Sequence, residues 1–174
     1  MLVALAAREE LALDRLFFIP AAQSPFKPGT QPAPAAIRLR MLRVALAGHS
    51  HYEVDDQEIQ RGGTSYTVDT LRDYARRFPA ANMFYLIGAD HVATLSKWRD
   101  AEALAQLATF VIIPRPGERA AEAPSPFRVQ RLAGWPLQLS SSEIRTRVRN
   151  GLSIRHLVPA GVEEIVRRTG LYAA

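Results

Sequence analysis

Residues 83–90 read MFYLIGAD, an apolar run that ends in a glycine, an alanine and an aspartate. The length of the run and its aromatic and β-branched side chains predict a buried strand over residues 83–87. A second apolar run, TFVII at residues 109–113, stops at Pro114 and predicts another strand. The fold is therefore expected to contain these two buried strands, and the sequence around them indicates how the chain connects them.

Helical patterns alternate with strand patterns on both sides of these two runs. Helices are expected at residues 2–13, 35–47, 67–78, 90–95, 100–107, 141–150 and 160–169, and further strands at 16–19, 52–59 and 135–139. Two proline-rich loops are expected at residues 21–34 and 117–126. This alternation predicts an α/β protein in which helices cover both faces of a parallel sheet.

The composition is that of a globular chain, with 174 residues of which 48% are apolar and 22% charged. That length predicts one domain, residues 1–174. Cysteine is absent, which excludes disulfides and metal sites with sulfur ligands and fits a cytoplasmic location. No run approaches the roughly 20 apolar residues of a membrane span, so we expect no membrane partner.

The net charge of +5 suits an anionic ligand such as a phosphate, and an arginine-rich genome would give the same excess. The basic residues are mixed with acids and lack the interleaved aromatic residues of a nucleic-acid platform. We therefore expect no nucleic-acid partner. The four histidines, at positions 49, 51, 91 and 156, lack the spacing of metal ligands, so no protein-bound metal is expected either.

Candidate site residues follow the expected strands, where ligands bind in parallel α/β sheets. These residues are Lys27, Gly88, Asp90, Arg115 and the turn at residues 140–145. A glycine at position 88 lets a ligand approach the backbone, and the carboxylate of Asp90 can accept hydrogen bonds from ribose hydroxyls. A strand-ending glycine and a helix-capping aspartate would give the same pattern without a ligand.

The serine-rich turn that begins at Ser140 reads SSSEIR. If Ser140 is the N-cap of the next helix, Glu143 is its capping-box partner. The first-turn amides then point outward together with the hydroxyls of Ser141 and Ser142 and the guanidinium of Arg145, an arrangement that suits a phosphate chain. A capped helix with no ligand explains the same spacing.

Trp98 lies between two cations in the sequence Ser96-Lys97-Trp98-Arg99. Its indole could stack on a flat heteroaromatic ring of a ligand, or it could cover the edge of the core. Taken alone, this segment favours the second role.

Together these motifs resemble those of bacterial nicotinate-nucleotide adenylyltransferases, a family of Rossmann-like nucleotidyltransferases. The resemblance covers nearly the whole chain, and the motifs occur in the family's order. They are SPFKP at 24–28, RML at 40–42, SYTVDTL at 65–71, LIGAD at 86–90, KW at 97–98, RPG at 115–117, SSSEIR at 140–145 and LVP at 157–159. Each motif is weak alone, but so many in one order are hard to obtain by chance.

The resemblance implies a Rossmann-like sheet and the transfer of AMP from ATP to nicotinate mononucleotide, with Mg²⁺ present, giving deamido-NAD and pyrophosphate. It implies that Tyr66, Thr67 and Trp98 hold the nicotinate ring and its carboxylate. Asp90 and Arg115 are implied as further substrate ligands. The implied ligands of ATP and its phosphates are Lys27, Gly88, Ser140, Ser141, Ser142 and Arg145.

One motif of the family, G-x-F-D-x-x-H-x-G-H, whose histidines bind the ATP phosphates, does not occur in this sequence. No catalytic residue is therefore assigned. The spacing to Pro20 places Met1 just after that motif, so we expect a truncated or mis-started chain that also lacks the first strand of the sheet. Adenylyl transfer by the chain as printed is accordingly expected to be slight or absent.

Other functions remain open. The same fold could serve a different acceptor, such as nicotinamide mononucleotide or phosphopantetheine, although Tyr66, Thr67 and Trp98 argue against pantetheine. The chain could also be a non-catalytic nucleotide-binding module, and a basic nucleic-acid-binding protein ranks last. The sequence leaves the oligomeric state open, a homo-oligomer included.

Overall fold

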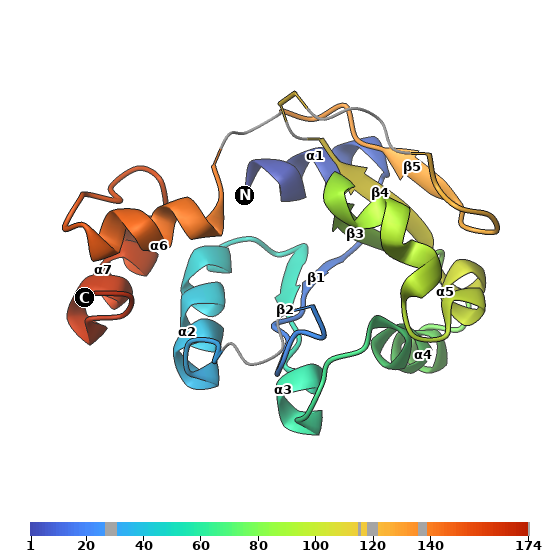
Figure 1. Ribbon diagram of the computed structural model, residues 1–174, viewed down its shortest axis with the longest axis horizontal. Helices are drawn as coiled ribbons and strands as arrows, with labels where there is room; N and C mark the ends of the chain where they lie inside the picture. Colours follow the sequence, from blue (N-terminus) through green and yellow to red (C-terminus); the bar gives the residue numbers. More distant parts are fainter. Residues whose placement is uncertain (27–30, 115, 118–121, 136–138, 174) are drawn as a thin grey trace. The chain divides into compact units, whose positions relative to one another are not determined.

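The computed structural model describes residues 1–26, 31–114, 116–117, 122–135 and 139–173. Helices and strands are interleaved along it, as expected for an α/β protein (Figure 1). The elements are α1 (Leu2–Glu10), β1 (Leu16–Phe18), α2 (Ala35–Leu46), β2 (Tyr52–Val54), α3 (Gln57–Arg61), α4 (Thr67–Arg77), β3 (Phe84–Gly88), the 3₁₀ helix η1 (Ala89–Lys97), α5 (Ala101–Leu107), β4 (Thr109–Ile113), β5 (Val129–Arg131), α6 (Ser141–Arg149) and α7 (Ala160–Thr169). Among the described residues, none of the helices combines the length and the apolar character that a membrane span requires.

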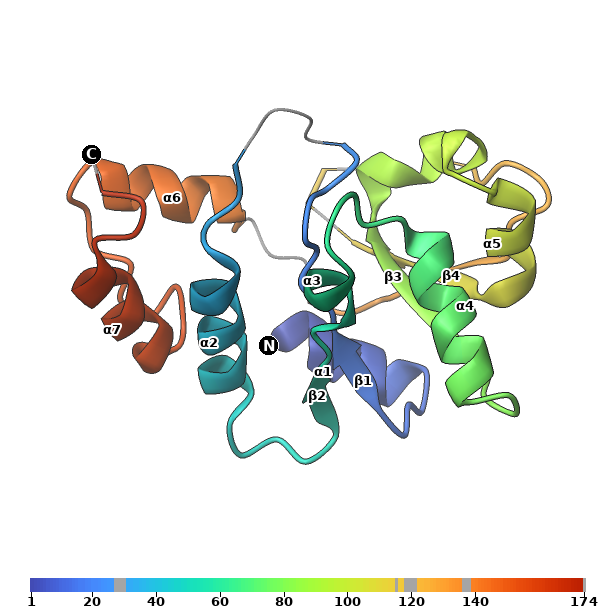
Figure 2. The ribbon, with the colours of Figure 1, turned by 90° about the horizontal axis from the view of Figure 1, so that it is seen from below.

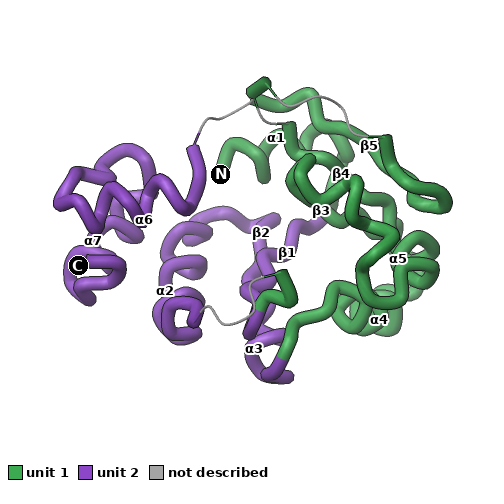
Figure 3. The backbone as a smooth tube through the Cα atoms, viewed as in Figure 1, with its two compact units in different colours: residues 1–14, 24–26, 64–137 green, residues 15–23, 27–63, 138–174 purple. Residues whose placement is uncertain are grey.

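The chain folds into two compact units (Figure 3). Unit 1 consists of Met1–Asp14, Ser24–Phe26 and Thr64–Leu137, and unit 2 consists of Arg15–Gln23, Lys27–Gly63 and Gln138–Ala174. Each unit draws on segments that are far apart in the sequence. Each also has a parallel sheet of its own, β3-β4-β5 in unit 1 and β1-β2 in unit 2.

β4 is the central strand of the sheet of unit 1, and both of its neighbours run parallel to it. In its pairing with β3, Phe84 lies opposite Thr109 and Gly88 lies opposite Ile113. Phe110 near the start of β4 is completely buried. Burial on both faces explains why β4 is a continuous apolar run and not an alternating pattern. Both apolar runs of the sequence are thus confirmed as strands, and they are neighbours.

Helices α4, η1 and α5 supply the helical part of the core of unit 1. α5 packs against α4 and η1, and η1 contacts β3 and β4 (Figure 2). On α4 the side chains of Val68, Leu71 and Tyr74 are buried at helical spacing, which makes the helix amphipathic. The buried core cluster consists of Val68, Leu71, Ile87, Ala89, Val92, Leu95, Leu104, Ala105, Ala108, Phe110, Ile112 and Phe127.

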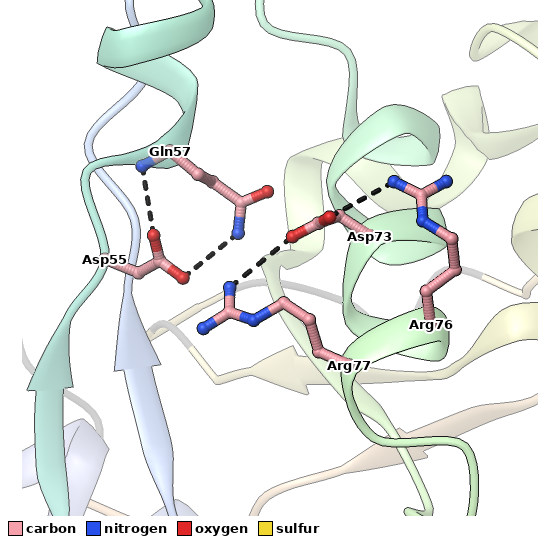
Figure 4. Close-up of polar contacts among 5 residues, drawn as sticks. All are labelled: Asp55, Gln57, Asp73, Arg76 and Arg77. Carbon is pink, nitrogen blue, oxygen red and sulfur yellow. Dashed lines mark hydrogen bonds and ion pairs between the residues drawn. The ribbon is translucent and has the colours of Figure 1, made fainter.

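The C-terminal turns of α4 carry a small cluster of ion pairs (Figure 4). Asp73 accepts hydrogen bonds from Arg76 at 3.1 Å and from Arg77 at 3.4 Å. The guanidinium carbon of Arg77 also lies 4.9 Å from the centroid of the Tyr74 ring. Exposed pairs at this spacing stabilise a helix by about 0.3–0.5 kcal/mol each. α4 ends at Arg77 because Pro79, two residues later, cannot continue a helix.

The carboxylate of Glu10 links α1 to residues much later in the chain. It accepts hydrogen bonds from the backbone N–H groups of Ala133 and Gly134, both at 2.8 Å. A Cβ on Gly134 would lie 3.5 Å from the Cβ of Ala6, an ordinary van der Waals distance, so this segment packs directly against α1. Residues 133–134 therefore close against the first helix of unit 1.

Unit 2 contains the two-stranded parallel sheet, in which Leu16 of β1 lies opposite Tyr52 of β2. α2 packs against β2 and against α7. At the contact between the two helices, a Cβ on Gly161 would lie 2.3 Å from Cγ1 of Val44. The absence of a side chain at position 161 therefore permits the close approach of α7 to α2.

The strand expected at residues 52–59 is shorter than predicted. β2 ends at Val54, and the short helix α3 (Gln57–Arg61) begins within the predicted range and extends beyond it. Asp55 begins this turn, because its carboxylate accepts from the backbone N–H of Gln57 at 3.0 Å and from Nε2 of Gln57 at 3.1 Å (Figure 4). An aspartate that caps the N–H two residues later favours a turn over an extended strand.

The prediction of a strand at residues 135–139 is wrong for Trp135 and Leu139, the two of these residues that the structure describes. Trp135 and Leu139 are in irregular structure, and residues 136–138 lie outside the described part of the chain. The third strand of unit 1 is instead β5, which pairs with β4 through Val129 opposite Phe110. The sheet is completed by a segment that the sequence pattern had assigned to no element.

Candidate functional site

The carboxyl end of β3 presents Gly88 and Asp90, as the sequence predicted. The backbone at Gly88 is extended, with φ −70°, and η1 begins at the next residue. The short helix expected at residues 90–95 is this longer 3₁₀ helix. The side chain of Asp90 is 50% exposed, and its Oδ2 lies 3.8 Å from Nε2 of His91. The carboxylate is thus open to a ligand, and its contact with a ribose stays a prediction.

The indole of Trp98 follows η1 and is held on several sides. Its Nε1 donates a hydrogen bond to the hydroxyl of Thr94 at 3.4 Å. The rings of Tyr85 and Phe110 meet the indole edge-on, with centroid distances of 6.2 and 6.1 Å. Trp98 packs, partly buried, against the core cluster, so the prediction that it covers the core edge is confirmed. These contacts fix the plane of the indole, which a stacking surface for a ligand also requires.

Two further aromatic residues lie against Trp98. The Phe26 ring is tilted by 47° to the indole at a centroid distance of 5.3 Å, and its side chain is 50% exposed. The His91 ring lies 5.2 Å from Phe26 and 6.0 Å from Trp98. We call Phe26, Tyr85, His91 and Trp98 the ring cluster. The sequence offered one signal for it, the position of Phe26 next to the candidate residue Lys27.

The start of α4 joins the ring cluster through Tyr85. Tyr66 is the N-cap residue of α4 and Thr67 is its first helical residue. The hydroxyl of Thr67 lies 3.3 Å from the hydroxyl of Tyr85, within hydrogen-bond distance. Arg99, next to Trp98, places its guanidinium carbon 4.4 Å from the centroid of the Tyr66 ring. The structure thus brings together the three residues that the resemblance assigned to the nicotinate ring, Tyr66, Thr67 and Trp98.

In unit 2 the turn before α6 forms the N-cap that the sequence predicted. The hydroxyl of Ser140 accepts a hydrogen bond from the backbone N–H of Glu143 at 3.1 Å. The guanidinium of Arg145 donates to the hydroxyl of Ser142 at 2.9 Å, and Ser141 is exposed. First-turn amides have no acceptor within the helix, and the helix dipole is positive at this end. Amides, hydroxyls and one guanidinium therefore lie within a single turn.

Replacing Ser140 by alanine should destabilise the protein by about 1 kcal/mol, because the N–H of Glu143 loses its acceptor. We expect the affinity for ATP to fall as well if this turn binds phosphate. Urea unfolding measures the first effect and ATP titration the second. Ser140→Thr, which keeps a hydroxyl, should retain most of the stability, and Ser141→Ala is the stability control. Equal unfolding free energies for Ser140→Ala and the unaltered chain would contradict the capping role.

The predicted site residues are distributed over both units. Tyr66, Thr67, Gly88, Asp90 and Trp98 belong to unit 1, and Ser140, Ser141, Ser142 and Arg145 belong to unit 2. Lys27 and Arg115 lie outside the described residues. Ring-binding candidates are thus gathered within unit 1 and phosphate-binding candidates within unit 2.

Metal ligands do not gather anywhere in the part of the chain that the structure describes. No group of three or more histidine, cysteine, aspartate or glutamate side chains is placed to hold a metal ion there. Asp90 and His91 form a pair without a third member. The described residues therefore do not fit a resident metal centre.

Comparison with known proteins assigns the chain to a family. The model of the cytidylyltransferase-like family matches residues 1–147. Relatives from Opitutus terrae, Thermus thermophilus and Gemmatimonas aurantiaca, each named as a nicotinate-nucleotide adenylyltransferase, are 38%, 41% and 42% identical to it. The alignments cover 99% of this chain and 89%, 90% and 84% of those proteins. The chain belongs to the nicotinate-nucleotide adenylyltransferase family. It is a nucleotidyltransferase, and the resemblance seen in its motifs is confirmed.

Solved structures show the same fold for this adenylyltransferase family member. Nicotinic acid mononucleotide adenylyltransferase of Plasmodium falciparum, complexed with NaAD, matches with a TM-score of 0.75 at 15% identity. The match covers 98% of this chain and 90% of that one. The same Plasmodium protein complexed with APC gives a TM-score of 0.74. At such low identity the likeness concerns the fold, and it confirms the Rossmann-like α/β class.

Proposed function

We propose that the chain transfers the AMP moiety of ATP to nicotinate mononucleotide, giving deamido-NAD and pyrophosphate. The observation that carries this proposal is the identity of 38% to 42%, over 99% of the chain, to relatives named for that activity. The site of unit 1 supports it, because a fixed indole is linked through Tyr85 to Thr67, and Arg99, the residue after Trp98, contacts the ring of Tyr66. An exposed carboxylate, Asp90, follows β3 in the same unit.

The reaction needs no covalent intermediate on the protein. An oxygen of the mononucleotide phosphate attacks the α-phosphorus of ATP. The new P–O bond forms as the bond to the β-phosphate oxygen breaks, and pyrophosphate leaves with that electron pair. The protein then contributes by aligning the two phosphates and by stabilising negative charge in the transition state.

The candidate residues fall into groups that would bind the ring, the rest of a nucleotide and the phosphates. Trp98 would stack on the nicotinate ring, and Tyr66 and Thr67 would bind its carboxylate. Asp90 would accept hydrogen bonds from a nucleotide, with Gly88 and Arg115 as further contacts. The phosphate groups would be held by Lys27, Ser140, Ser141, Ser142 and Arg145. Ser140 is the N-cap of α6, Ser141 and Ser142 lie in its first turn, and Arg145 follows in the next turn.

Mg²⁺ would enter with ATP as part of the substrate, where it neutralises charge on the phosphate oxygens. The described residues gather no three ligands for it. No residue of the chain is therefore assigned to the metal, and the steps above depend on the protein's own groups.

Incubation with ATP, Mg²⁺ and nicotinate mononucleotide should produce deamido-NAD and pyrophosphate in equal amounts, which chromatography and a pyrophosphate assay can measure. We expect slight turnover by the chain as printed. The same chain preceded by the family's G-x-F-D-x-x-H-x-G-H segment should turn over faster by at least roughly 10²–10³-fold, since the loss of a single transition-state donor costs a factor of that order.

Two other outcomes would select the alternative functions. Binding of both nucleotides without turnover, even with the histidine segment present, would identify a non-catalytic nucleotide-binding module. Faster turnover with nicotinamide mononucleotide than with nicotinate mononucleotide would identify a different acceptor. Equal turnover of the two chain forms would contradict the expected role of the histidine segment.

A further inference from the structure

Asp100 begins α5 in an unusual way. It is the N-cap residue of this helix, yet its side chain accepts no hydrogen bond from the first-turn N–H groups. An aspartate at an N-cap normally makes that bond, from an extended backbone. The backbone of Asp100 is instead left-handed, with φ 53° and ψ 54°, a conformation that few residues other than glycine adopt. The capping of α5 therefore does not explain where this carboxylate lies.

The carboxylate of Asp100 pairs with the guanidinium of Arg72 in α4. The two residues are 28 positions apart, so the ion pair joins α4 to the segment that follows Trp98. Arg99 makes a second contact with the same helix. Its guanidinium carbon lies 4.4 Å from the centroid of the ring of Tyr66, the N-cap residue of α4. Two consecutive residues after the indole thus contact α4 at two points.

Trp98 is also linked to α4 through Tyr85. The indole meets the ring of Tyr85 edge-on, and the hydroxyl of Tyr85 lies 3.3 Å from the hydroxyl of Thr67 at the start of α4. One route to α4 therefore runs through Tyr85 and another runs through residues 99 and 100. Two routes restrict the distance and the orientation between the indole and the start of α4 more than either route would alone.

We propose that Arg72 and Asp100 are positioning residues, which hold Trp98 and the start of α4 at the spacing that a bound pyridine mononucleotide requires. The inference rests on the proposed function, in which the ring stacks on Trp98 and its substituent meets Tyr66 and Thr67. A site that is arranged before the ligand arrives loses less conformational entropy on binding. The left-handed backbone of Asp100 belongs to this arrangement, as strained conformations do where they serve a binding site.

The two side chains carry opposite charges, which separates an effect of position from an effect of the electric field. Loss of the cation at Arg72 would weaken the binding of an anionic ligand through the field, whereas loss of the anion at Asp100 would strengthen it. If the ion pair acts by position, both changes weaken binding. The expected loss is roughly two- to fivefold in the dissociation constant, because exposed ion pairs contribute energies in that range.

The test is calorimetric titration of nicotinate mononucleotide into the unaltered chain, Arg72→Gln, Asp100→Asn and the double variant. Asparagine tolerates the left-handed backbone, so Asp100→Asn removes the charge alone. Each single variant should bind roughly two- to fivefold more weakly, and the double variant should bind no more weakly than they do, because all three lack the same interaction. Arg76→Gln is the matched control, since the ion pair of Arg76 with Asp73 lies within α4, and it should bind like the unaltered chain.

Tryptophan fluorescence reports on the indole without any ligand. The chain has two tryptophans, so Trp98 is the only one in a Trp135→Phe background. In that background Arg72→Gln and Asp100→Asn should each increase the fast local motion seen in time-resolved anisotropy, and Arg76→Gln should not. Urea unfolding of each variant shows whether the fold persists, and Arg72→Lys, which keeps the charge, should recover part of the lost affinity.

Opposite effects of Arg72→Gln and Asp100→Asn on affinity would overturn the inference, because they would reveal an effect of charge. Additive losses in the double variant, unchanged affinities or unchanged anisotropy would overturn it as well. If the unaltered chain binds no mononucleotide, the proposed function fails. The anisotropy measurement then still decides whether the ion pair holds the indole.

Discussion

Replacement of Trp98 by alanine should weaken the binding of nicotinate mononucleotide by roughly 5- to 150-fold and leave ATP binding nearly unchanged. Stacking of a base on an aromatic side chain is worth about 1–3 kcal/mol, which corresponds to that range of dissociation constants. The contacts with Thr94, Tyr85 and Phe110 hold the indole before the ligand arrives, so little ordering is lost on binding. Titration calorimetry with each nucleotide measures the effect.

The chain offers a matched control because it has two tryptophans. Trp135 is 51% exposed, and Trp135→Ala should leave the affinity for the mononucleotide as it is. Trp98→Phe, which keeps a flat ring, should recover part of the lost affinity. Since Trp98 also packs on the core, urea unfolding of each variant is needed to show that the fold persists. A folded Trp98→Ala protein with unaltered affinity would rule out stacking on this residue.

Replacement of Phe110 by alanine should lower the free energy of unfolding by about 3–5 kcal/mol, since it leaves a cavity in the centre of the sheet of unit 1. Phe110 is completely buried. Its ring lies 5.6 Å from that of Tyr85, 6.1 Å from Trp98 and 5.2 Å from Phe127. Urea unfolding followed by tryptophan fluorescence measures the loss. Because Phe110 supports two rings of the ring cluster, mononucleotide binding should weaken too.

Two control variants test whether the loss of stability comes from the buried side chain of Phe110. Phe110→Leu should cost clearly less than Phe110→Ala, because it removes less of the buried side chain. Leu2→Ala changes an exposed residue of α1 in the same unit and should change the unfolding free energy by no more than about 0.5 kcal/mol. A loss below about 1 kcal/mol for Phe110→Ala would contradict the prediction, because it would show that neighbouring core residues move into the cavity.

The strands of unit 1 differ in how far the sequence reveals them. β3 and β4 were predictable because burial makes each of them a continuous apolar run, which is a local signal. β5 has one apolar residue, Val129, and its other two residues are exposed. No local pattern marks it as a strand, and its conformation depends on hydrogen bonds to β4, a contact between distant segments. β2 shows the opposite case, in which a local interaction shortens a predicted strand. Asp55 accepts a hydrogen bond from the N–H of Gln57, and this turn ends the strand at Val54.

The same distinction applies to the candidate site. The cap at Ser140 was predictable because both partners lie within one turn. The ring cluster was not, since Phe26 and Trp98 come from distant segments of the chain that meet only in the folded unit 1. Arg99 was visible as a cation beside Trp98. That it stacks on Tyr66, and does not pair with Asp100, depends on the position of α4.

The carboxylate of Glu10 and its donors Ala133 and Gly134 are separated by 123 and 124 residues. During synthesis α1 leaves the ribosome early, long before the N–H groups that bind Glu10 have been translated. The two hydrogen bonds that Glu10 accepts cannot form before then. Unit 1 therefore reaches its final form only after most of the polypeptide has emerged, unlike proteins whose N-terminal domain folds first.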